Sequence, residues 1–459
     1  MKETFARFQK SVLTLYAFIM YALNMAAFFL LFSIDNPEII SLSRTAAVTL
    51  STYVIFLFLL SAVYGSYDVG KRKEKETAFS LSLAAILTDL VTYFELTIMK
   101  TNEANNAHFK LENIGILFLV FVLQIFIILL FTRLGNRFYF LVNGRERCVI
   151  VAGGKGQDSA ERVRAALNDF SKRYEVIDTV SCKDPKLFER LLPADTIVMY
   201  DVPVEKRQEI VDFSYKNLKS VYYNPQIADI IEQHSKPIVV DDISFFASEF
   251  HLIGFEERIL KRLLDVLVSV LALVCLSPLF LFSALWIKQY DHGPVFFKQK
   301  RATVNGRVFE IYKFRTMREN SGNRSVTRDD DRITAPGRFL RKYRIDELPQ
   351  FINILKGDMS VVGPRPEMLE NVEEYTKELP EFVYRLRMKA GLTGYAQIYG
   401  RYNTSSRDKL MLDLMYIENY SFLKDIQIIF RTVLVLFKAE DSTEAFSDEY
   451  KNQRGDGLL

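Results

Sequence analysis

The chain has 459 residues, of which 49% are hydrophobic and 25% charged, and its formal net charge is +3. This small charge, with no long run of lysine or arginine, argues against a nucleic-acid-binding protein. The three cysteines lack CxxC spacing and the four histidines are scattered, so neither a disulfide framework nor a zinc site is indicated. The high apolar content favours a membrane part joined to a folded aqueous part.

Four apolar stretches come first, each close to the ~20 residues that a helix needs to cross the hydrocarbon core. They cover residues 11–32, 46–64, 78–99 and 112–132. The third contains Asp89 and Glu95, which are costly in lipid unless they are paired or near an interface. Basic residues precede the first stretch and follow the second and fourth, so these flanks are expected in the cytoplasm. We expect residues 1–146 to form four spanning helices that serve as an anchor or a dimerisation surface, rather than in regulation or lipid flipping.

From residue 147 to residue 250 the pattern changes to short apolar runs that alternate with amphipathic helices. The expected strands are residues 148–152, 176–180, 196–200 and 220–223, and the expected helices are residues 160–174, 185–192, 205–215 and 226–233. Such alternation is typical of a small doubly wound α/β domain with a parallel sheet.

The first of these strands ends in the turn Gly153-Gly154-Lys155-Gly156. Phosphate is often held at this position of a doubly wound fold. The spacing is not GxGxxG, however, and there is no Walker serine or threonine. Both a structural turn and an anion site therefore stay open.

A fifth apolar run covers residues 263–287 and has basic residues at both ends. Ser277-Pro278 lies near its middle, where proline removes a backbone donor and the serine hydroxyl can satisfy a freed carbonyl. A helix that enters the membrane, bends at Pro278 and returns to the same face satisfies both facts. The alternative, a kinked spanning helix, would put all later residues outside the cell.

The segment after this run contains both acidic and basic residues, and we expect it to form a compact domain. Strands are expected at residues 294–300 and 307–314, joined by an Asn305-Gly306 turn of the type I′ hairpin kind. Helices are expected at residues 337–343, 348–356, 368–377 and 409–419, with an in-plane membrane helix at residues 422–437. We expect this domain to cover residues 251–438 and to be followed by a flexible acidic tail, residues 439–459.

The adjacent carboxylates Asp346 and Glu347 are the leading catalytic candidates. Pro349 is tolerated only in a first helical turn and Gly357 is a plausible helix stop, so Asp346 is expected at a helix start. The helix dipole there favours an ionised, low-pKa aspartate, which can attack phosphorus once nearby positive groups screen the phosphate. Glu347 could hold Mg²⁺, and Arg365, between two prolines, could offer a bidentate fork to a phosphate. Taken alone, the pair could also be an ordinary helix cap.

Residues 257–437 resemble the bacterial polyprenyl-phosphate sugar-1-phosphate transferases, and the leading helices with the α/β domain resemble the long form of that family. The residues that carry the resemblance are, in order, Lys261-Arg262 with Asp265, Ser277-Pro278, Gly293-Pro294-Val295-Phe296-Phe297, Lys313-Phe314-Arg315-Thr316-Met317, Asp331-Arg332-Ile333-Thr334, Gly337-Arg338-Phe339-Leu340-Arg341, Asp346-Glu347, Gly363-Pro364-Arg365-Pro366 and Gly391-Leu392-Thr393-Gly394-Tyr395-Ala396-Gln397. Two departures, Ala390 for proline and Tyr395 for tryptophan, put the choice of donor in doubt.

The resemblance implies a membrane protein with a four-helix transmembrane bundle, a Rossmann-like parallel α/β domain and a re-entrant-helix-anchored α+β monotopic phosphoglycosyl transferase domain. It implies transfer of a hexose 1-phosphate, with glucose or galactose favoured, from a UDP-sugar to undecaprenyl phosphate, with UMP released. Asp346 would carry the phosphosugar, Glu347 would bind Mg²⁺ and Arg365 would bind phosphate. Further phosphate or nucleotide contacts are expected from Lys313, Arg315, Arg332, Arg338 and Arg401.

This reaction would start capsule or exopolysaccharide synthesis at the cytoplasmic face of the bacterial plasma membrane. Membrane lipid is an expected partner, and a homodimer is one expected assembly. Two alternatives stay open: the same reaction with a UDP-N-acetylhexosamine or a modified amino sugar, and an inactive membrane scaffold or receptor. The intact Asp346-Glu347 pair speaks against the second.

Overall fold

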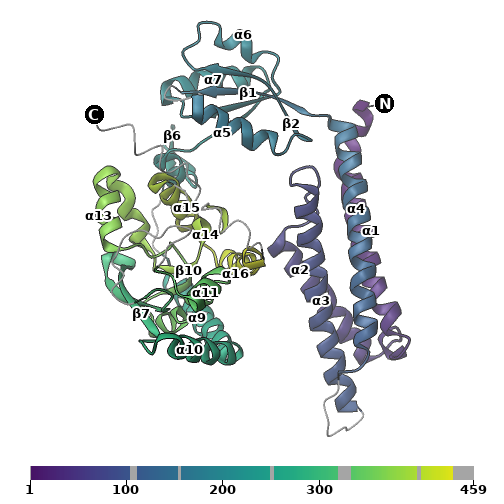
Figure 1. The fold of residues 1–459 in the computed structure, drawn as a ribbon. Coiled ribbons are helices and arrows are strands. Elements are labelled where there is room, and N and C mark those ends of the chain that lie inside the picture. Colours follow the sequence, from purple (N-terminus) through teal and green to yellow (C-terminus); the bar gives the residue numbers. More distant parts are fainter. Residues whose placement is uncertain are drawn as a thin grey trace. The chain divides into compact units, whose positions relative to one another are not determined.

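The computed structural model describes residues 2–103, 111–153, 157–248, 253–318, 332–400 and 405–437. Its internal contacts divide the chain into two compact units, Met1–Asn224 and Pro225–Leu459. The first unit holds four long apolar helices and a parallel sheet (Figure 1). The second unit holds a bent pair of apolar helices and the turn with Asp346 and Glu347. The expected α/β region, residues 147–250, therefore crosses the division, because α8 (Ile227–Glu232) packs against α15 (Ser406–Glu418).

Four long helices open the first unit: α1 (Lys2–Phe32), α2 (Arg44–Tyr64), α3 (Glu74–Glu103) and α4 (Ile114–Asn143). A short 3₁₀ turn, η1 (Pro37–Ile39), links the first two. Each of the four contains a segment that is long and apolar enough to cross a membrane, as the sequence predicts. Helix α1 packs on α4, and α3 packs on both α2 and α4.

A buried polar layer joins all four helices. Gln124 of α4 donates from Nε2 to the Asn24 carbonyl at 3.0 Å, to the Tyr53 hydroxyl at 3.2 Å and to Asp89 Oδ1 at 3.1 Å. Glu95 accepts from the Thr52 hydroxyl at 3.0 Å. Asp89 and Glu95, the two acidic residues of the apolar stretch 78–99, thus have partners inside the bundle, which lowers the cost of placing them in an apolar layer.

The sheet of the first unit has the order β2-β1-β3-β4, and every pair is parallel. Its strands and helices are β1 (Glu146–Ala152), α5 (Gln157–Asn168), β2 (Tyr174–Ser181), α6 (Leu187–Leu191), β3 (Thr196–Tyr200), α7 (Val204–Lys216) and β4 (Ser220–Tyr223). Val149 and Val151 enter one apolar cluster, while Cys148 and Ile150 enter another. Both faces of β1 are therefore covered, which explains its unbroken apolar run.

Gly153 ends β1 where a Cβ atom would lie 1.5 Å from the Asp201 carbonyl oxygen. Only glycine fits so close to the end of β3, and this packing accounts for Gly153 as part of a structural turn. The other residues of the expected anion site, Gly154, Lys155 and Gly156, lie outside the described residues.

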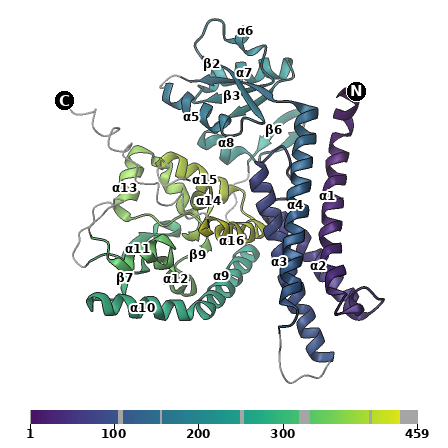
Figure 2. The ribbon, with the colours of Figure 1, turned by 45° about the vertical axis from the view of Figure 1, so that its right-hand side comes forward.

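The second unit begins with α8 and an antiparallel hairpin, β5 (Lys236–Val240) and β6 (Ile243–Ala247). Helices α9 (Phe255–Cys275) and α10 (Ser277–Asp291) follow, and their axes differ by 63° at Leu276 (Figure 2). The break falls at Ser277-Pro278, as predicted, and the Ser277 hydroxyl donates to the Val274 carbonyl at 2.8 Å.

The core of the second unit is built on two small strand pairs. β7 (Phe296–Ala302) and β8 (Val308–Phe314) form the predicted hairpin, with positive φ at both Asn305 and Gly306 within the turn η2 (Val304–Gly306). β9 (Ser360–Val362) and β10 (Gly391–Thr393) pair in parallel. The surrounding helical segments are α11 (Ala335–Lys342), η3 (Ile345–Glu347), α12 (Gln350–Lys356), α13 (Leu369–Glu378), η4 (Pro380–Arg387), α14 (Tyr395–Tyr399), α15 and α16 (Phe422–Phe437).

Candidate active site

Asp346 and Glu347 lie in the single 3₁₀ turn η3, between α11 and α12. The turn follows Arg344, whose φ of 54° reverses the chain after α11, and Ile345 anchors the turn in an apolar cluster. Helix α12 itself begins only at Gln350, after Pro349, which has no N–H to continue a hydrogen-bond ladder. Asp346 therefore precedes the helix that the sequence places it on, while Gly357 ends that helix as predicted, with a φ of 87°.

Glu347 is held by two cations. Its Oε1 atom lies 3.0 Å from Lys313 Nζ and 3.1 Å from an Arg365 guanidinium nitrogen, and only 14% of its side chain is exposed. Burial alone would raise the pKa of Glu347, but Lys313 and Arg365, with Arg344, lower it below the ordinary value. Glu347 is thus ionised throughout the physiological pH range. Through its contacts with Lys313 and Arg365, Glu347 also links β8 to the Pro364-Arg365-Pro366 loop.

The pKa of Asp346 is shifted in the opposite direction. Burial, and then the negative charge of Glu347, raise the pKa of Asp346 to about 6, against the positive charges of Lys313, Arg341 and Arg365. This differs from the low pKa that a helix start predicts, because Asp346 is buried and lies beside a permanent anion. At neutral pH Asp346 is ionised for most of the time, and it is more basic than an ordinary aspartate. Two carboxylates with separated pKa values are typical of sites that give them separate roles.

The loop that carries Arg365 is fixed through its backbone. Gly363 N–H donates to the Thr393 carbonyl at 2.8 Å, and Gly391 N–H donates to the Pro364 carbonyl at 2.9 Å. A Cβ atom on Gly391 would lie 2.0 Å from the Gly363 nitrogen, so the two segments approach more closely than any side chain allows. The glycines of the two motifs thus serve to bring β10 against the start of the Arg365 loop.

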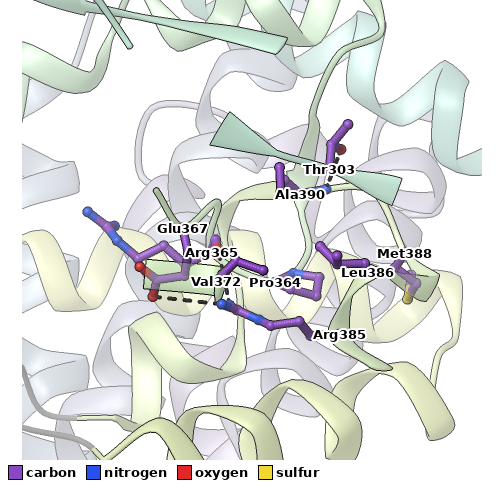
Figure 3. Close-up of a pocket in the computed structure, with 10 residues that line it drawn as sticks. Thr303, Pro364, Arg365, Glu367, Val372, Arg385, Leu386, Met388 and Ala390 are labelled. Atoms are coloured by element: carbon purple, nitrogen blue, oxygen red, sulfur yellow. Dashed lines mark hydrogen bonds and ion pairs between the residues drawn. The ribbon is translucent and has the colours of Figure 1, made fainter. Parts of the chain in front are cut away.

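Arg385 supports the same loop from below, as Figure 3 shows. It donates to the Arg365 carbonyl at 2.8 Å and pairs with Asp413 at 2.6 Å, and both partners of this ion pair are buried. Glu367 lies 3.7 Å from Arg385 and 3.3 Å from Lys409. The cavity behind the loop holds only about 10 Å³, so it has room for about one water and not for a substrate.

The other predicted contacts are dispersed. The Arg315 guanidinium pairs with Asp291 and donates to the Pro294 carbonyl at 2.7 Å, so it ties β8 to the end of α10. Arg332 is buried, and Arg338 is exposed on α11. Arg401 lies outside the described residues. Of the predicted cations, the structure brings Lys313 and Arg365 to the carboxylate pair.

Two arginines near the pair were missing from the predicted site. Arg341 acts on the Asp346 charge and Arg344 acts on the Glu347 charge, each lowering the carboxyl pKa. Arg341 also donates from Nε to the Thr316 hydroxyl at 2.8 Å, which fixes its side chain. Their closeness to Asp346 in the sequence was the one feature that could have indicated them. The turn at Arg344, which brings them to the pair, was not predictable from residue periodicity.

A divalent cation would find few protein ligands here. Among the described residues, no three His, Cys, Asp or Glu side chains gather as a metal-binding group. Mg²⁺, however, is commonly held by one or two carboxylates together with water and substrate phosphates. The carboxyl oxygens of Asp346 and Glu347 fit that limited donor set.

The arrangement combines a carboxylate of raised pKa, a permanently ionised carboxylate and several fixed cations, as phosphoryl chemistry requires. Residues 256–439 match the model of the family described as bacterial sugar transferase. The chain is 40% identical over 190 residues to the UDP-glucose:undecaprenyl-phosphate glucose-1-phosphate transferase of Caulobacter vibrioides, covering 40% of this chain and 71% of that one. The chain belongs to the bacterial sugar transferase family.

Two further relatives differ in the sugar that they are named for. The undecaprenyl-phosphate galactose phosphotransferase of Salmonella typhimurium is 30% identical over 328 residues, which cover 62% of this chain and 67% of that one. The UDP-N-acetylgalactosamine-undecaprenyl-phosphate N-acetylgalactosaminephosphotransferase of Aeromonas hydrophila is 43% identical over 180 residues, covering 38% of this chain and less than half, 43%, of that one. The family assignment makes the chain a phosphoglycosyl transferase.

Proposed function

We propose that the chain transfers a hexose 1-phosphate, glucose or galactose first, from a UDP-sugar to undecaprenyl phosphate and so starts capsule or exopolysaccharide synthesis. The observation that carries this proposal is the environment of Asp346. Its pKa is raised to about 6, it lies beside Glu347, and the positive charges of Lys313 and Arg365 act on it. The names of the Caulobacter and Salmonella relatives support the donor and acceptor classes.

In the first step a carboxylate oxygen of Asp346 attacks the phosphorus that bears the sugar. An O–P bond to Asp346 forms, the bond between this phosphorus and the bridging oxygen of the diphosphate breaks, and UMP leaves with that oxygen. Arg365 and Lys313 offset the negative charge of the donor phosphates, which would otherwise repel the attacking carboxylate. Because Asp346 has a pKa of about 6, it is both mostly ionised and more nucleophilic than an ordinary aspartate at neutral pH.

In the second step a phosphate oxygen of undecaprenyl phosphate attacks the same phosphorus. The O–P bond to Asp346 breaks, which regenerates the carboxylate and yields the lipid diphosphate sugar. Glu347 stays ionised in both steps because two cations hold it. When Mg²⁺ is bound, Glu347 and the donor phosphates would be its ligands, and its charge would help the leaving phosphate depart.

The bent pair α9 and α10 supports a re-entrant anchor. Near the start of α9, Arg262 donates to the carbonyls of Ile354 and Leu355 at 2.6 Å, and at the end of α10 Asp291 pairs with Arg315. Both outer ends of the pair are thus bound to one folded domain, which favours entry and exit on the same face of the membrane. The large apolar side chains that remain exposed between these ends include Leu263, Val266, Leu267, Val270, Leu271, Val274, Leu276, Leu281, Phe282 and Leu285.

This anchor would hold the carboxylate pair at the depth of the acceptor phosphate, whose polyprenyl tail lies in lipid. The basic flanks of the four spanning helices favour the cytoplasmic face of the plasma membrane, where UDP-sugars are made. A single cysteine placed at Glu256 or at His292 would then react with an impermeant thiol reagent only from the cytoplasmic side. Labelling of one of these positions from outside would contradict the re-entrant anchor.

The decisive experiment uses the full chain in nanodiscs with undecaprenyl phosphate, Mg²⁺ and a panel of UDP-sugars. UMP release with UDP-glucose or UDP-galactose supports the proposed donor, and release with UDP-N-acetylgalactosamine alone supports the alternative for which the Aeromonas relative is named. Asp346→Asn should abolish UMP release, while Glu378→Gln, an exposed acid on α13, should not. Without acceptor, mass spectrometry should find the phosphosugar on Asp346, and recovery on another side chain would refute the mechanism.

A further inference from the structure

A basic hollow lies in the first unit where α4 leaves the apolar bundle. It has a volume of about 480 Å³ and is open to solvent. Its lining combines four basic residues with one acid, one amide and one aromatic ring, together with Gly144. These side chains are Arg133, Arg137, Arg145, Lys172, Glu74, Asn136 and Phe140.

Acidic side chains among the described residues do not balance the charges of the basic hollow. Lys172 faces Glu74 at 3.5 Å, but the parts of the chain that the structure describes supply no hydrogen bond or ion pair to the guanidinium groups of Arg133, Arg137 or Arg145. Arg133 and Arg137 are four residues apart on α4, so their like charges share one helix face and repel. The net charge of the lining, four cations against one carboxylate, is +3. An anionic ligand would relieve this repulsion.

The position of the hollow along α4 matches the surface of a bilayer. Arg133 follows Ile114 by 19 residues, which at 1.5 Å per residue is about 29 Å of helix. The hydrocarbon core is about 30 Å thick, so Arg133 falls at its edge and Arg137 falls in the headgroup layer, while Arg145 follows the end of α4 and lies farther from the core. Phe140 adds a half-buried aromatic ring at the same level.

The far wall of the hollow is held in place by the parallel-sheet part of the unit. Arg173, next to Lys172, donates to the Lys71 carbonyl at 3.4 Å, and Lys73 pairs with Asp169. The rings of Phe140 and Phe170 meet edge to face, with centroids 6.5 Å apart. Asn136 is fixed as well, because its amide binds Gly70 N–H and the Thr132 carbonyl. The lining is therefore formed by residues of the helix bundle and of the parallel-sheet part of the first unit. Contacts between these two parts hold it in place.

We propose that the basic hollow binds the phosphate headgroup of an anionic membrane phospholipid, such as phosphatidylglycerol. Basic residues at the end of a spanning helix also set its orientation in the membrane. Lys71, Arg72 and Lys73, however, already provide a basic flank at the start of α3. Orientation alone does not require three unpaired guanidinium groups around one hollow at headgroup depth. Arginine is suited to phosphate because its planar fork donates two parallel hydrogen bonds.

The test compares lipid binding by the full chain and two matched variants. Arg133→Gln with Arg137→Gln removes two cations of the hollow, and Arg162→Gln with Arg164→Gln removes two exposed cations on α5. Native mass spectrometry in mixed micelles measures binding of phosphatidylglycerol and phosphatidylcholine. The hollow variant should bind phosphatidylglycerol about tenfold or more weakly, since each basic residue near an anionic surface contributes about 1 kcal/mol. The α5 variant should bind it as wild type does.

Further variants and a competitor distinguish loss of lipid binding from a folding defect, and a lipid ligand from a soluble phosphate. Arg133→Lys with Arg137→Lys keeps the charge and should retain most of the binding, and Arg145→Gln tests the hollow from the segment after α4. Unchanged phosphatidylglycerol binding in both glutamine variants of the hollow would overturn the proposal. Equal affinity for phosphatidylcholine would overturn it too. Displacement of the lipid by an equal concentration of glycerol 3-phosphate would show a site for soluble phosphates and overturn the assignment to lipid.

Discussion

Lys261 Nζ lies 2.6 Å from Asp425 Oδ2, and this ion pair joins the first part of the bent apolar pair to the last helix of the catalytic domain. The two side chains are 8% and 1% exposed. The ammonium also donates to the Val362 carbonyl at 2.9 Å and to the Tyr416 hydroxyl at 3.2 Å, so α9, β9, α15 and α16 meet at one nitrogen. Helix α9 is thereby tied to the strand that leads into the Arg365 loop.

Lys261→Met should destabilise the protein by about 3–5 kcal/mol, because it leaves the Asp425 carboxylate buried without its cation. The melting temperature of the purified chain in detergent measures this loss. Lys261→Met with Asp425→Asn should recover a large part of it, since the double variant removes both charges of this ion pair. Additive losses in the double variant would show that the two residues do not stabilise each other.

Asp346→Asn should abolish UMP release without lowering the melting temperature at pH 7. The pKa of Asp346 is raised from 3.8 to about 6 in the folded chain. Folding therefore favours the protonated form, and stability from this group is gained as pH falls from about 6 toward 4 and lost as pH rises. At pH 7 the ionised carboxylate opposes folding by on the order of 1–3 kcal/mol, which the neutral amide removes. A lower melting temperature for Asp346→Asn would show that the carboxylate supports the fold.

Sequence patterns predicted the elements with strong periodicity but not the links between motifs, and the catalytic role of Asp346 and Glu347 stays a prediction. The four apolar helices, the parallel strands, the β7–β8 hairpin and the break at Pro278 follow from local patterns, and the structure confirms them. The β5–β6 hairpin was missed, although the pair Asp241-Asp242, with a φ of 60° at Asp241, marks its turn. The support of Arg365 by Arg385 depends on a contact between residues 20 positions apart, which no periodicity encodes.

The low pKa expected for Asp346 fails for a related reason. Sequence reasoning placed the carboxylate on a helix start, whereas Arg344 and Pro349 confine it to a separate turn. In that turn burial raises the pKa of Asp346, and the negative charge of Glu347 raises it further. The pKa of a carboxyl group depends on such three-dimensional neighbours, so the electrostatics of the pair could not be predicted from the sequence.

Lys313→Met should move the acid limb of the pH profile to higher pH. The Lys313 charge lowers the pKa of Asp346, so its removal raises that pKa above about 6 and protonates the nucleophile earlier as pH falls. The measurement is kcat/KM for UMP release between pH 5 and 8. Lys300→Met, an exposed cation on neighbouring β7, should leave the limb in place. An unmoved limb in Lys313→Met would show that another group controls it.

Gly391→Ala should displace the Arg365 loop and reduce UMP release strongly. The new Cβ would lie 2.0 Å from the Gly363 nitrogen and 2.6 Å from its Cα, and neither backbone atom can move aside as a flexible side chain can. The parallel pair β9 and β10 must therefore open, which also weakens the Gly391 hydrogen bond to Pro364. Gly254→Ala is the matched control, because its Cβ would meet nothing nearer than a Glu257 oxygen at 3.5 Å. Equal activity and melting temperature for the two alanine variants would show that β9 and β10 tolerate separation, and that Arg365 does not depend on their contact.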